Sequence, residues 1–280
     1  MTLTARHTEQ AALFRALHSR RPLVLPNVWD ASSVALAQAA GASAVATTSA
    51  GIAWAHGVPD GQRLTREQMV RAVGGLVRAT TLPVTADIES GYGAGSPADV
   101  AETVRAVILA GAVGINLEDS PGQGDQPLLS TEAQAERLQA ARAAAQSLGA
   151  DLFINARTDV FLAGFGPAES RLQEAVRRGN LYLRAGADGV FVPGVSDEAS
   201  IAALARHIGG PVNIMVGSSS PEIQALGRLA VARVSLGPAL ALAALGTVRS
   251  ALSELLQHGT YTALAQGYPY TEAEALFFRP

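Results

Sequence analysis

The chain lacks two of the residue types on which enzymes often build covalent catalysis. It contains no cysteine, which excludes disulfides, a thiolate nucleophile and a thiol acid. It also contains no lysine, because all 21 of its basic residues are arginine. Without lysine the chain cannot form the Schiff base of an aldolase, anchor pyridoxal phosphate or build a P-loop.

The chain also has little excess of either charge and no long apolar run. The formal net charge of −3 over 280 residues argues against a basic surface for nucleic acid, so we expect no nucleic-acid partner. No stretch offers the roughly 18 uninterrupted apolar residues of a spanning helix, and the polar N-terminus has no signal-peptide core. We therefore expect a cytoplasmic protein with no membrane partner.

Eight short apolar segments, typical of buried strands, alternate regularly with helical segments. The predicted strands lie at 23–26, 44–49, within 82–93, and at 114–119, 152–159, 189–193, 212–216 and 231–236. Helices are predicted at 8–19, 31–40, 65–79, 97–110, 131–148, 167–185, 197–207, 221–229 and 239–257. The pattern predicts one α/β domain over residues 1–280, a (β/α)8 TIM barrel. A doubly wound sheet is the alternative, but the chain lacks a G-x-G-x-x-G loop.

Residues 239–280 exceed what one barrel requires, since a single helix suffices after the eighth strand. We expect this segment to be a C-terminal helical part that mediates assembly into a homodimer or homotetramer. Packing of the segment on its own barrel is the alternative.

The stretch from Leu82 to Gly93 is the most informative in the chain. It joins a buried strand to a glycine-rich loop through two carboxylates, Asp87 and Glu89. Residues two apart on a strand point to the same face, so the two carboxylates are expected to converge. Such a pair is costly unless a cation lies between its members. Solvated loop carboxylates or a helix cap are the plain alternative.

Further polar residues follow the neighbouring strands, where catalytic groups of a barrel lie. The expected group consists of Asp60, Asp87, Glu89, Glu118, Asp119 and Asp159 facing Arg157. Carboxylate oxygens suit Mg²⁺, with Mn²⁺ as the alternative. Zinc fits poorly, because there is no cysteine and no histidine near these strand ends.

Arg157 allows two interpretations. It could neutralise Asp87 or Glu118 in a buried network, or its planar guanidinium could hold a substrate carboxylate, and we favour the second role. Ser49, Ala50 and Gly51 are small residues whose backbone N–H groups could approach an anionic oxygen. An ordinary tight turn is the alternative there. Trp29 is interpreted as a wall of the substrate pocket or as core.

Six motifs occur in the order and spacing of one known family. They are Asn27-Val28-Trp29-Asp30, Thr48-Ser49-Ala50-Gly51, Gly57-Val58-Pro59-Asp60, Asp87-Ile88-Glu89-Ser90-Gly91-Tyr92-Gly93, Asn116-Leu117-Glu118-Asp119 and Ala156-Arg157-Thr158-Asp159. Over nearly the whole barrel the chain resembles the isocitrate lyase and phosphoenolpyruvate mutase superfamily.

The resemblance implies a set of roles for these residues. Asp87 would bind Mg²⁺ directly, and Asp60, Glu89 and Glu118 would surround the ion through water. A 2-oxo acid would chelate the metal through its carboxylate and keto oxygens. Arg157 and the amides of Ser49, Ala50 and Gly51 would complete its binding. The resemblance also implies a last helix that is exchanged between subunits.

The loop after the fourth strand departs from the family pattern. Lyases of this family carry a Lys-Lys/Arg-Cys-Gly-His motif there, whose cysteine donates a proton, and the mutases carry an asparagine. Residues 120–127 contain no Cys, Lys, His or Asn. We therefore do not expect isocitrate or methylisocitrate lyase activity. Solvent or Tyr92 could supply the proton instead, although Tyr92 could equally be a wall of the pocket.

Together these features predict a Mg²⁺-dependent lyase that cleaves or decarboxylates a small 2-oxo acid, or a precursor of one, through a stabilised enolate. The candidate ligands are pyruvate, oxaloacetate, 2-oxoglutarate and phosphonopyruvate. Phosphonopyruvate hydrolase or phosphoenolpyruvate mutase chemistry is one alternative, and would require Ser120, Ser130 or Thr131 at the metal. A 2-oxo-acid-binding protein without turnover is the other.

Overall fold

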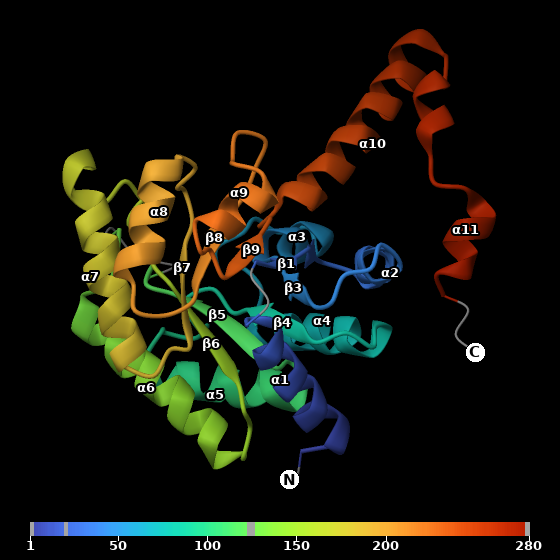
Figure 1. Ribbon diagram of the computed structural model, residues 1–280. Helices are drawn as coiled ribbons and strands as arrows, with labels where there is room; N and C mark the ends of the chain where they lie inside the picture. The colour runs from blue at the N-terminus through green and yellow to red at the C-terminus, as the bar shows by residue number, and fades with distance from the viewer. Residues whose placement is uncertain (1–2, 20–21, 122–126, 278–280) are drawn as a thin grey trace.

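The computed structural model describes residues 3–19, 22–121 and 127–277 and shows nine parallel strands surrounded by helices (Figure 1). The sheet order is β1-β9-β8-β7-β6-β5-β4-β3-β2. The strands are β1 (Leu23–Leu25), β2 (Asn27–Val28), β3 (Val45–Thr47), β4 (Val84–Asp87), β5 (Gly114–Glu118), β6 (Phe153–Arg157), β7 (Gly189–Val192), β8 (Val212–Met215) and β9 (Arg233–Ser235). The predicted (β/α)8 barrel is confirmed.

The first strand of the barrel is divided at Pro26, which explains why nine strands are found where eight were expected. Proline has no N–H to give to a sheet ladder, so it interrupts the strand. On one side of the break β1 pairs with β9, and on the other side β2 pairs with β3. The two halves together join the last strand to the second and close the barrel.

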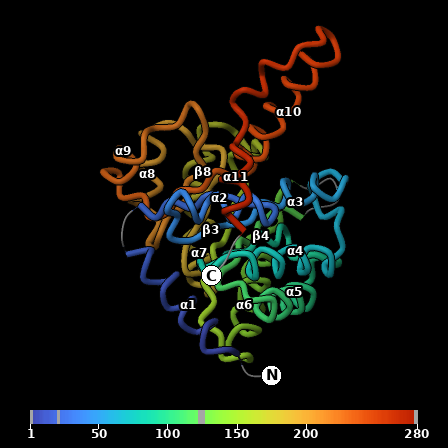
Figure 2. The backbone as a smooth tube through the Cα atoms, turned by 90° about the vertical axis from the view of Figure 1, so that its right-hand side faces the viewer, coloured from blue at the N-terminus to red at the C-terminus, as the bar shows by residue number. Residues whose placement is uncertain are grey.

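Helices follow the strands along the chain and cover the outside of the sheet, except for the last two, which extend away from the barrel (Figures 1 and 2). They are α1 (Ala5–Leu17), α2 (Ala31–Ala39), α3 (Ser49–Ala55), α4 (Arg66–Ala79), α5 (Pro97–Leu109), α6 (Thr131–Ser147), α7 (Arg171–Arg184), α8 (Glu198–His207), α9 (Ile223–Arg228), α10 (Ala239–His258) and α11 (Tyr270–Ala275). All nine predicted helices are present. The sequence did not predict α3, whose first residues had been assigned to the end of a strand and the turn after it.

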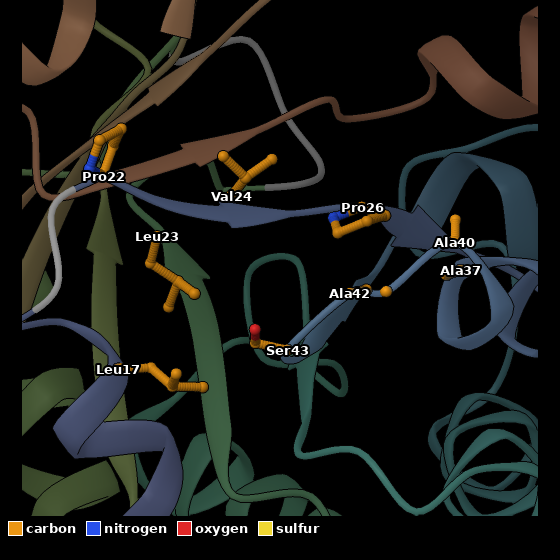
Figure 3. Close-up of a pocket in the computed structure, with 10 residues that line it drawn as sticks. Leu17, Pro22, Leu23, Val24, Pro26, Ala37, Ala40, Ala42 and Ser43 are labelled. Atoms are coloured by element: carbon orange, nitrogen blue, oxygen red, sulfur yellow. The ribbon is translucent and has the colours of Figure 1, made fainter. Parts of the chain in front are cut away.

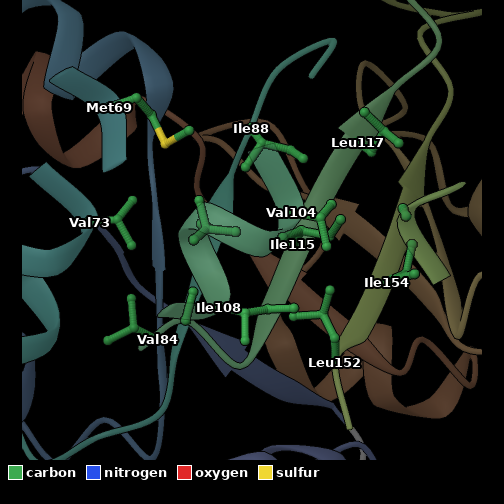
Figure 4. Close-up of a cluster of buried hydrophobic side chains, with 14 of the residues drawn as sticks. Met69, Val73, Val84, Ile88, Val104, Ile108, Ile115, Leu117, Leu152 and Ile154 are labelled. Carbon is green, nitrogen blue, oxygen red and sulfur yellow. The ribbon is translucent and has the colours of Figure 1, made fainter. Parts of the chain in front are cut away.

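Alternation along β5 shows how the strands divide the core from the barrel interior. Ile115 and Leu117 are fully buried, and Figure 4 shows them among apolar side chains from neighbouring strands and helices. Asn116 and Glu118 alternate with them and therefore point to the opposite face. The apolar core thus lies between sheet and helices, and polar side chains are left for the inside of the barrel.

Helix α1 closes the amino-terminal end of the barrel. Its Phe14 is fully buried and meets the ring of Phe153 edge-on, with 5.7 Å between centroids. Gly114 must be glycine here, because a Cβ atom would come within 2.9 Å of the Phe14 ring. With this end filled by aromatic rings, the carboxyl ends of the strands are where a ligand can enter.

Helix α10 projects away from the barrel (Figures 1 and 2). Of its 20 residues only Ala241 is buried, and Leu245, Leu252 and Leu256 are at least half exposed. Among the described residues it is the one helix whose length and composition would also permit it to span a membrane. The predicted C-terminal helical segment is present, and the described residues leave most of the α10 surface exposed.

Candidate active site

A cavity of about 200 Å³ lies at the carboxyl ends of the strands, where the sequence placed the chemistry. Its polar lining comprises Asn27, Thr48, Ser49, Asp60, Asp87, Asn116, Arg157 and Ser235. The other lining residues are Ala50, Leu162, Phe191, Pro193, Met215, Gly237 and Pro238. The cavity therefore brings together a carboxylate from the loop after the second predicted strand, a carboxylate at the end of the third, one guanidinium, and an apolar wall.

Asp87 ends β4 at the floor of this cavity and is 9% exposed. Its backbone N–H donates to Thr47 Oγ1 at 2.8 Å, and its Oδ1 accepts from the N–H of Glu89 at 3.1 Å. Burial raises the pKa of Asp87, and the positive charge of Arg157 opposes that rise. A cation bound beside this carboxylate would offset the cost of burying its charge.

Glu89 lies beyond the end of β4 and leaves the strand geometry, with a φ of 49°. Its carboxylate accepts a hydrogen bond from the Gln62 N–H at 2.5 Å and another from the Tyr92 hydroxyl at 2.7 Å. Burial is the main reason that its pKa rises to about 7. The two-residue alternation expected to unite Asp87 and Glu89 therefore stops at Asp87, and Glu89 lies outside the cavity lining.

Tyr92 also lies outside the cavity lining and is 3% exposed. Its hydroxyl is occupied with Glu89, and its N–H donates to Gln62 Oε1 at 2.6 Å. Burial raises the pKa of the Tyr92 hydroxyl. Gln62, which sequence reasoning missed, thus holds both residues in place. No local spacing marks Gln62 in advance, because its partners are 27 to 30 residues away.

Arg157 ends β6 and takes part in a buried network of carboxylates, the first of the two roles considered for it. Its Nη1 pairs with Glu118 at 2.9 Å, and its Nε and Nη2 bond to Asp159 at 2.6 and 3.0 Å. Burial lowers the pKa of Arg157, but the surrounding carboxylates more than reverse this and keep the pKa raised. The same guanidinium lines the cavity. The two carboxylates therefore hold a permanently charged group at a fixed position against the ligand space.

Glu118 lies behind Arg157, outside the cavity lining. Burial raises its pKa well above the ordinary value, and the guanidinium at 2.9 Å opposes that rise. Its role in the structure is to orient Arg157.

The four predicted metal ligands occupy two layers. Asp87 and the exposed Asp60 line the cavity, whereas Glu89 and Glu118 lie behind it. Among the described residues, no three His, Asp or Glu side chains are placed to ligate one ion directly. The oxygen donors fit Mg²⁺, which commonly binds one or two carboxylates and keeps several waters. Asp87 and Asp60 are the residues that would hold it.

The three residues whose amides were predicted to bind the substrate, 49–51, form the first turn of α3, and only two of them line the cavity. Ser49 and Ala50 line the cavity, but the Gly51 N–H donates to the capping Thr48 hydroxyl at 3.4 Å. A Cβ atom on Gly51 would come within 2.9 Å of the Trp29 Cβ. Gly51 is thus needed for close packing of α3 against Trp29, which itself does not line the cavity.

Asp119 does not face the cavity mouth, contrary to the sequence prediction. It is fully buried and accepts hydrogen bonds from the side chains of Thr158, Arg178 and Tyr182 at 2.7 to 3.0 Å. It therefore ties β5 to α7 on the outside of the barrel. The period-two alternation that sends Glu118 inward sends its neighbour outward.

A wider hollow, of about 430 Å³, lies between the first strand and α2 (Figure 3). It is lined by Leu17, Pro22, Leu23, Val24, Pro26, Ala37, Ala40, Gly41, Ala42 and Ser43. None of these side chains titrates, and one hydroxyl is the only polar side-chain group among them. The charged and titratable side chains line the smaller cavity instead.

Residues 14–256 match the sequence profile of phosphoenolpyruvate phosphomutase. The chain belongs to the phosphoenolpyruvate phosphomutase family. The superfamily expected from the six motifs is thereby confirmed. This phosphomutase-family chain is 31% identical over 212 residues to oxaloacetate decarboxylase 2 of Pseudomonas fluorescens, covering 73% of this chain and 68% of that one.

Two solved structures resemble the phosphomutase-family chain over almost its whole length. A Burkholderia cenocepacia protein is 39% identical, with a TM-score of 0.91 and 98% of each chain covered. Phosphonopyruvate hydrolase, solved with oxalate and Mg²⁺, is 25% identical, with a TM-score of 0.83 and 99% of this chain and 95% of that chain covered. Decarboxylase and hydrolase chemistries thus occur among proteins similar to this one.

Proposed function

We propose that the protein is a cytoplasmic Mg²⁺-dependent lyase acting on a small 2-oxo acid. It breaks the bond between the carbon next to the keto group and that carbon's substituent, by cleavage or decarboxylation. The observation that carries the proposal is that Asp87 and the carboxylate-held guanidinium of Arg157 face one small cavity. The similarity to an oxaloacetate decarboxylase supports the reaction, and the hydrolase solved with Mg²⁺ and oxalate supports the metal and the ligand class.

The residues of the cavity suit this chemistry. A Mg²⁺ ion held by Asp87 and Asp60 would supply Lewis acidity at the keto oxygen. Arg157 binds the substrate carboxylate, and its position needs no reorganisation because Glu118 and Asp159 already hold it. When the carbon–carbon bond breaks, its electron pair moves toward the keto oxygen, and the positive charge of Arg157 stabilises the developing negative charge.

A proton must then reach the carbon that lost its partner. Solvent in the cavity is the donor that the geometry favours, because the Tyr92 hydroxyl is occupied with Glu89 and is buried. We therefore assign Tyr92 the role of positioning Glu89, with direct proton donation by Tyr92 as the alternative.

The phosphonopyruvate alternative requires a hydroxyl from the loop after β5, and two of the three candidates are occupied elsewhere. Ser130 Oγ caps α6 by accepting from the Ala133 N–H at 3.1 Å. Thr131 is buried and donates to Glu132 Oε1 at 2.8 Å. Neither lines the cavity. These contacts favour the lyase over a hydrolase or mutase.

Binding and turnover of four acids test the proposal. Pyruvate, oxaloacetate, 2-oxoglutarate and phosphonopyruvate would be titrated calorimetrically with and without Mg²⁺, and their consumption followed by NMR. We expect Mg²⁺-dependent binding and turnover of at least one acid. Arg157→Ala should weaken binding about 10- to 100-fold, the effect of losing a charge-assisted hydrogen bond.

Arg105→Ala, on the exposed face of α5, is the matched control and should leave binding unchanged. Absence of metal-dependent binding by the unmodified protein would refute the proposed function. Tight binding without consumption of any acid would favour the binding-protein alternative.

A further inference from the structure

The cavity has two chemically different sides. One side is formed by Asp60, which lies in the loop after α3, together with Asp87 at the end of β4 and Arg157 at the end of β6. Leu162, Phe191, Pro193, Met215 and Pro238 form the other, following β6 to β9. Phe191 is 4% exposed, and its ring centroid lies 5.7 Å from Arg157 Cζ, so the guanidinium stands at the border between the two sides.

Arg157 is the one cationic side chain among the described residues that line this cavity. Its charge is already shared with Glu118 and Asp159. Arg233 lies deeper in the barrel, with Nη2 3.4 Å from Asn116 Oδ1, and is not part of the lining. The cavity can therefore neutralise one substrate carboxylate at Arg157, and offers no second cation on the opposite side.

The loops around the apolar side cannot provide that second cation either. Residues 158–170, 193–197, 216–222 and 236–238 contain no Lys, Arg or His. The loop after α3 carries His56 and Arg63, which are exposed and do not line the cavity. A second carboxylate on a substrate would thus be buried against apolar side chains without a partner, which is strongly unfavourable.

The packing of the apolar wall is specific. Met215 lies against Gly237, where any Cβ atom would come within 2.5 Å of the Met215 sulfur. Gly237 has a φ of 54°, a conformation that favours glycine. The backbone of the β9 loop is therefore shaped to admit the Met215 side chain at the cavity wall.

We propose that the substrate is a 4-hydroxy-2-oxo acid with a single carboxylate and a short aliphatic end, which packs against Leu162, Phe191 and Met215. The bond between its third and fourth carbons breaks, its electron pair moves toward the keto oxygen, and the fourth carbon leaves as an uncharged aldehyde while its hydroxyl proton passes to solvent. This inference rests on the proposed function and narrows its substrate class. The volume of about 200 Å³ limits the ligand to a small molecule, since pockets for drug-sized ligands are larger.

An isosteric pair of acids provides the test. Oxaloacetate and 4-methyl-2-oxopentanoate share the 2-oxo carboxylate and the next methylene, and differ in a terminal carboxylate against an isopropyl group of similar shape. Both would be titrated calorimetrically into the full-length Mg²⁺-loaded protein, together with pyruvate as the common core. We expect 4-methyl-2-oxopentanoate to bind at least tenfold more tightly than oxaloacetate.

Placing a cation in the apolar wall should reverse the preference. Met215→Arg is expected to bind oxaloacetate at least tenfold more tightly than its isostere, and Met215→Gln, of similar length but neutral, should show no such reversal. Leu162→Arg provides a second route, because this side chain is 53% exposed at the cavity and tolerates replacement more readily.

The outcomes separate the two proposals. Tighter binding of oxaloacetate than of its isostere by the unmodified protein would overturn the substrate class while leaving the proposed function intact. Failure of pyruvate and of both larger acids to bind in the presence of Mg²⁺ would overturn the proposed function itself.

Discussion

At the closed end of the barrel, the imidazole of His18 stacks on the ring of Phe153, with 3.9 Å between centroids. Its Nδ1 donates to the Phe14 carbonyl at 2.8 Å, and its Nε2 has no hydrogen-bond partner among the described residues. Burial lowers the pKa of His18 to about 4, and the positive charges of Arg233 and Arg15 contribute to the decrease. The folded protein therefore keeps this ring neutral under mildly acidic conditions.

His18 should make the protein less stable as the pH falls from about 6.5 to about 4. Its pKa is lower in the folded state, so in this window the unfolded chain binds a proton that the folded chain does not. Between pH 7 and pH 5 the resulting loss is about 2 kcal/mol. The free energy of unfolding, measured in urea at both pH values, would reveal it.

His18→Phe is the matched variant, because a phenyl ring can replace the imidazole in the aromatic stack without titrating. The free energy of unfolding should change less between pH 7 and pH 5 in this variant than in the unmodified protein, by about 2 kcal/mol. If the free energy of unfolding had the same pH dependence in both proteins, His18 would not be the cause of the loss of stability.

At the scale of elements, α3 determines where Ser49 and Ala50 lie in the active site. The helix packs so closely on Trp29 that its third residue, Gly51, must be glycine. A Cβ atom at this position would come within 2.7 Å of Thr48 Cγ2. An alanine there would push the helix, and with it the cavity wall, away from its position.

Gly51→Ala should therefore weaken binding of the 2-oxo acid about tenfold or more and reduce stability by about 1–3 kcal/mol, the usual cost of overpacking. Calorimetric titration and urea unfolding would measure the two effects. Gly75→Ala is the control, because no atom lies within 4 Å of a Cβ atom at this α4 position. It should leave binding unchanged and increase stability by about 0.5–1 kcal/mol. Unchanged binding in Gly51→Ala would contradict the role assigned to α3.

The elements that sequence reasoning predicted are those with a clear local signal. The period of apolar residues marks the strands and longer helices, and a capping box such as Thr65 with Gln68 marks a helix start. The seven-residue α3 was missed because its Ser-Ala-Gly-Ile start has no apolar period and follows directly on a strand. Short helices of this kind are stabilised by tertiary packing, which no local pattern reports.

For the residues of the candidate site, the sequence predicted which strand carries each one, but not the direction of each side chain. Strand position alone identified Asp87 and Arg157, which line the cavity together. Glu89 turns away because its φ is positive and because Gln62, distant in sequence, bonds to its carboxylate. Such contacts depend on the closed barrel, so alternation along one strand could not predict them.

At the scale of the whole molecule, α10 presents an exposed apolar stripe. Leu245, Val248, Leu252 and Leu256 follow at intervals of three and four residues, and each is at least half exposed. A stripe of this kind normally faces another protein surface. We propose that it packs on a second copy of the chain, as the resemblance to swapped-helix enzymes implied.

Leu245→Glu combined with Leu252→Glu should convert a dimer or tetramer into monomers, because burying two carboxylates in an apolar interface is unfavourable. Light scattering coupled to gel filtration would give the mass of each species. Ser250→Glu, at an exposed position on the other side of the helix, should leave the mass unchanged. A monomeric unmodified protein would contradict the proposal.

The division of the first strand at Pro26 also affects how the protein folds during its synthesis. Leu23 pairs with Arg233, and the Asn27 carboxamide accepts hydrogen bonds from the amides of Leu236 and Gly237 at 2.8 and 3.0 Å. More than 200 further residues must be synthesised on the ribosome before β1 can pair with β9. Since Asn27 and Gly237 both line the cavity, the cavity wall is complete only after translation has passed the last strand.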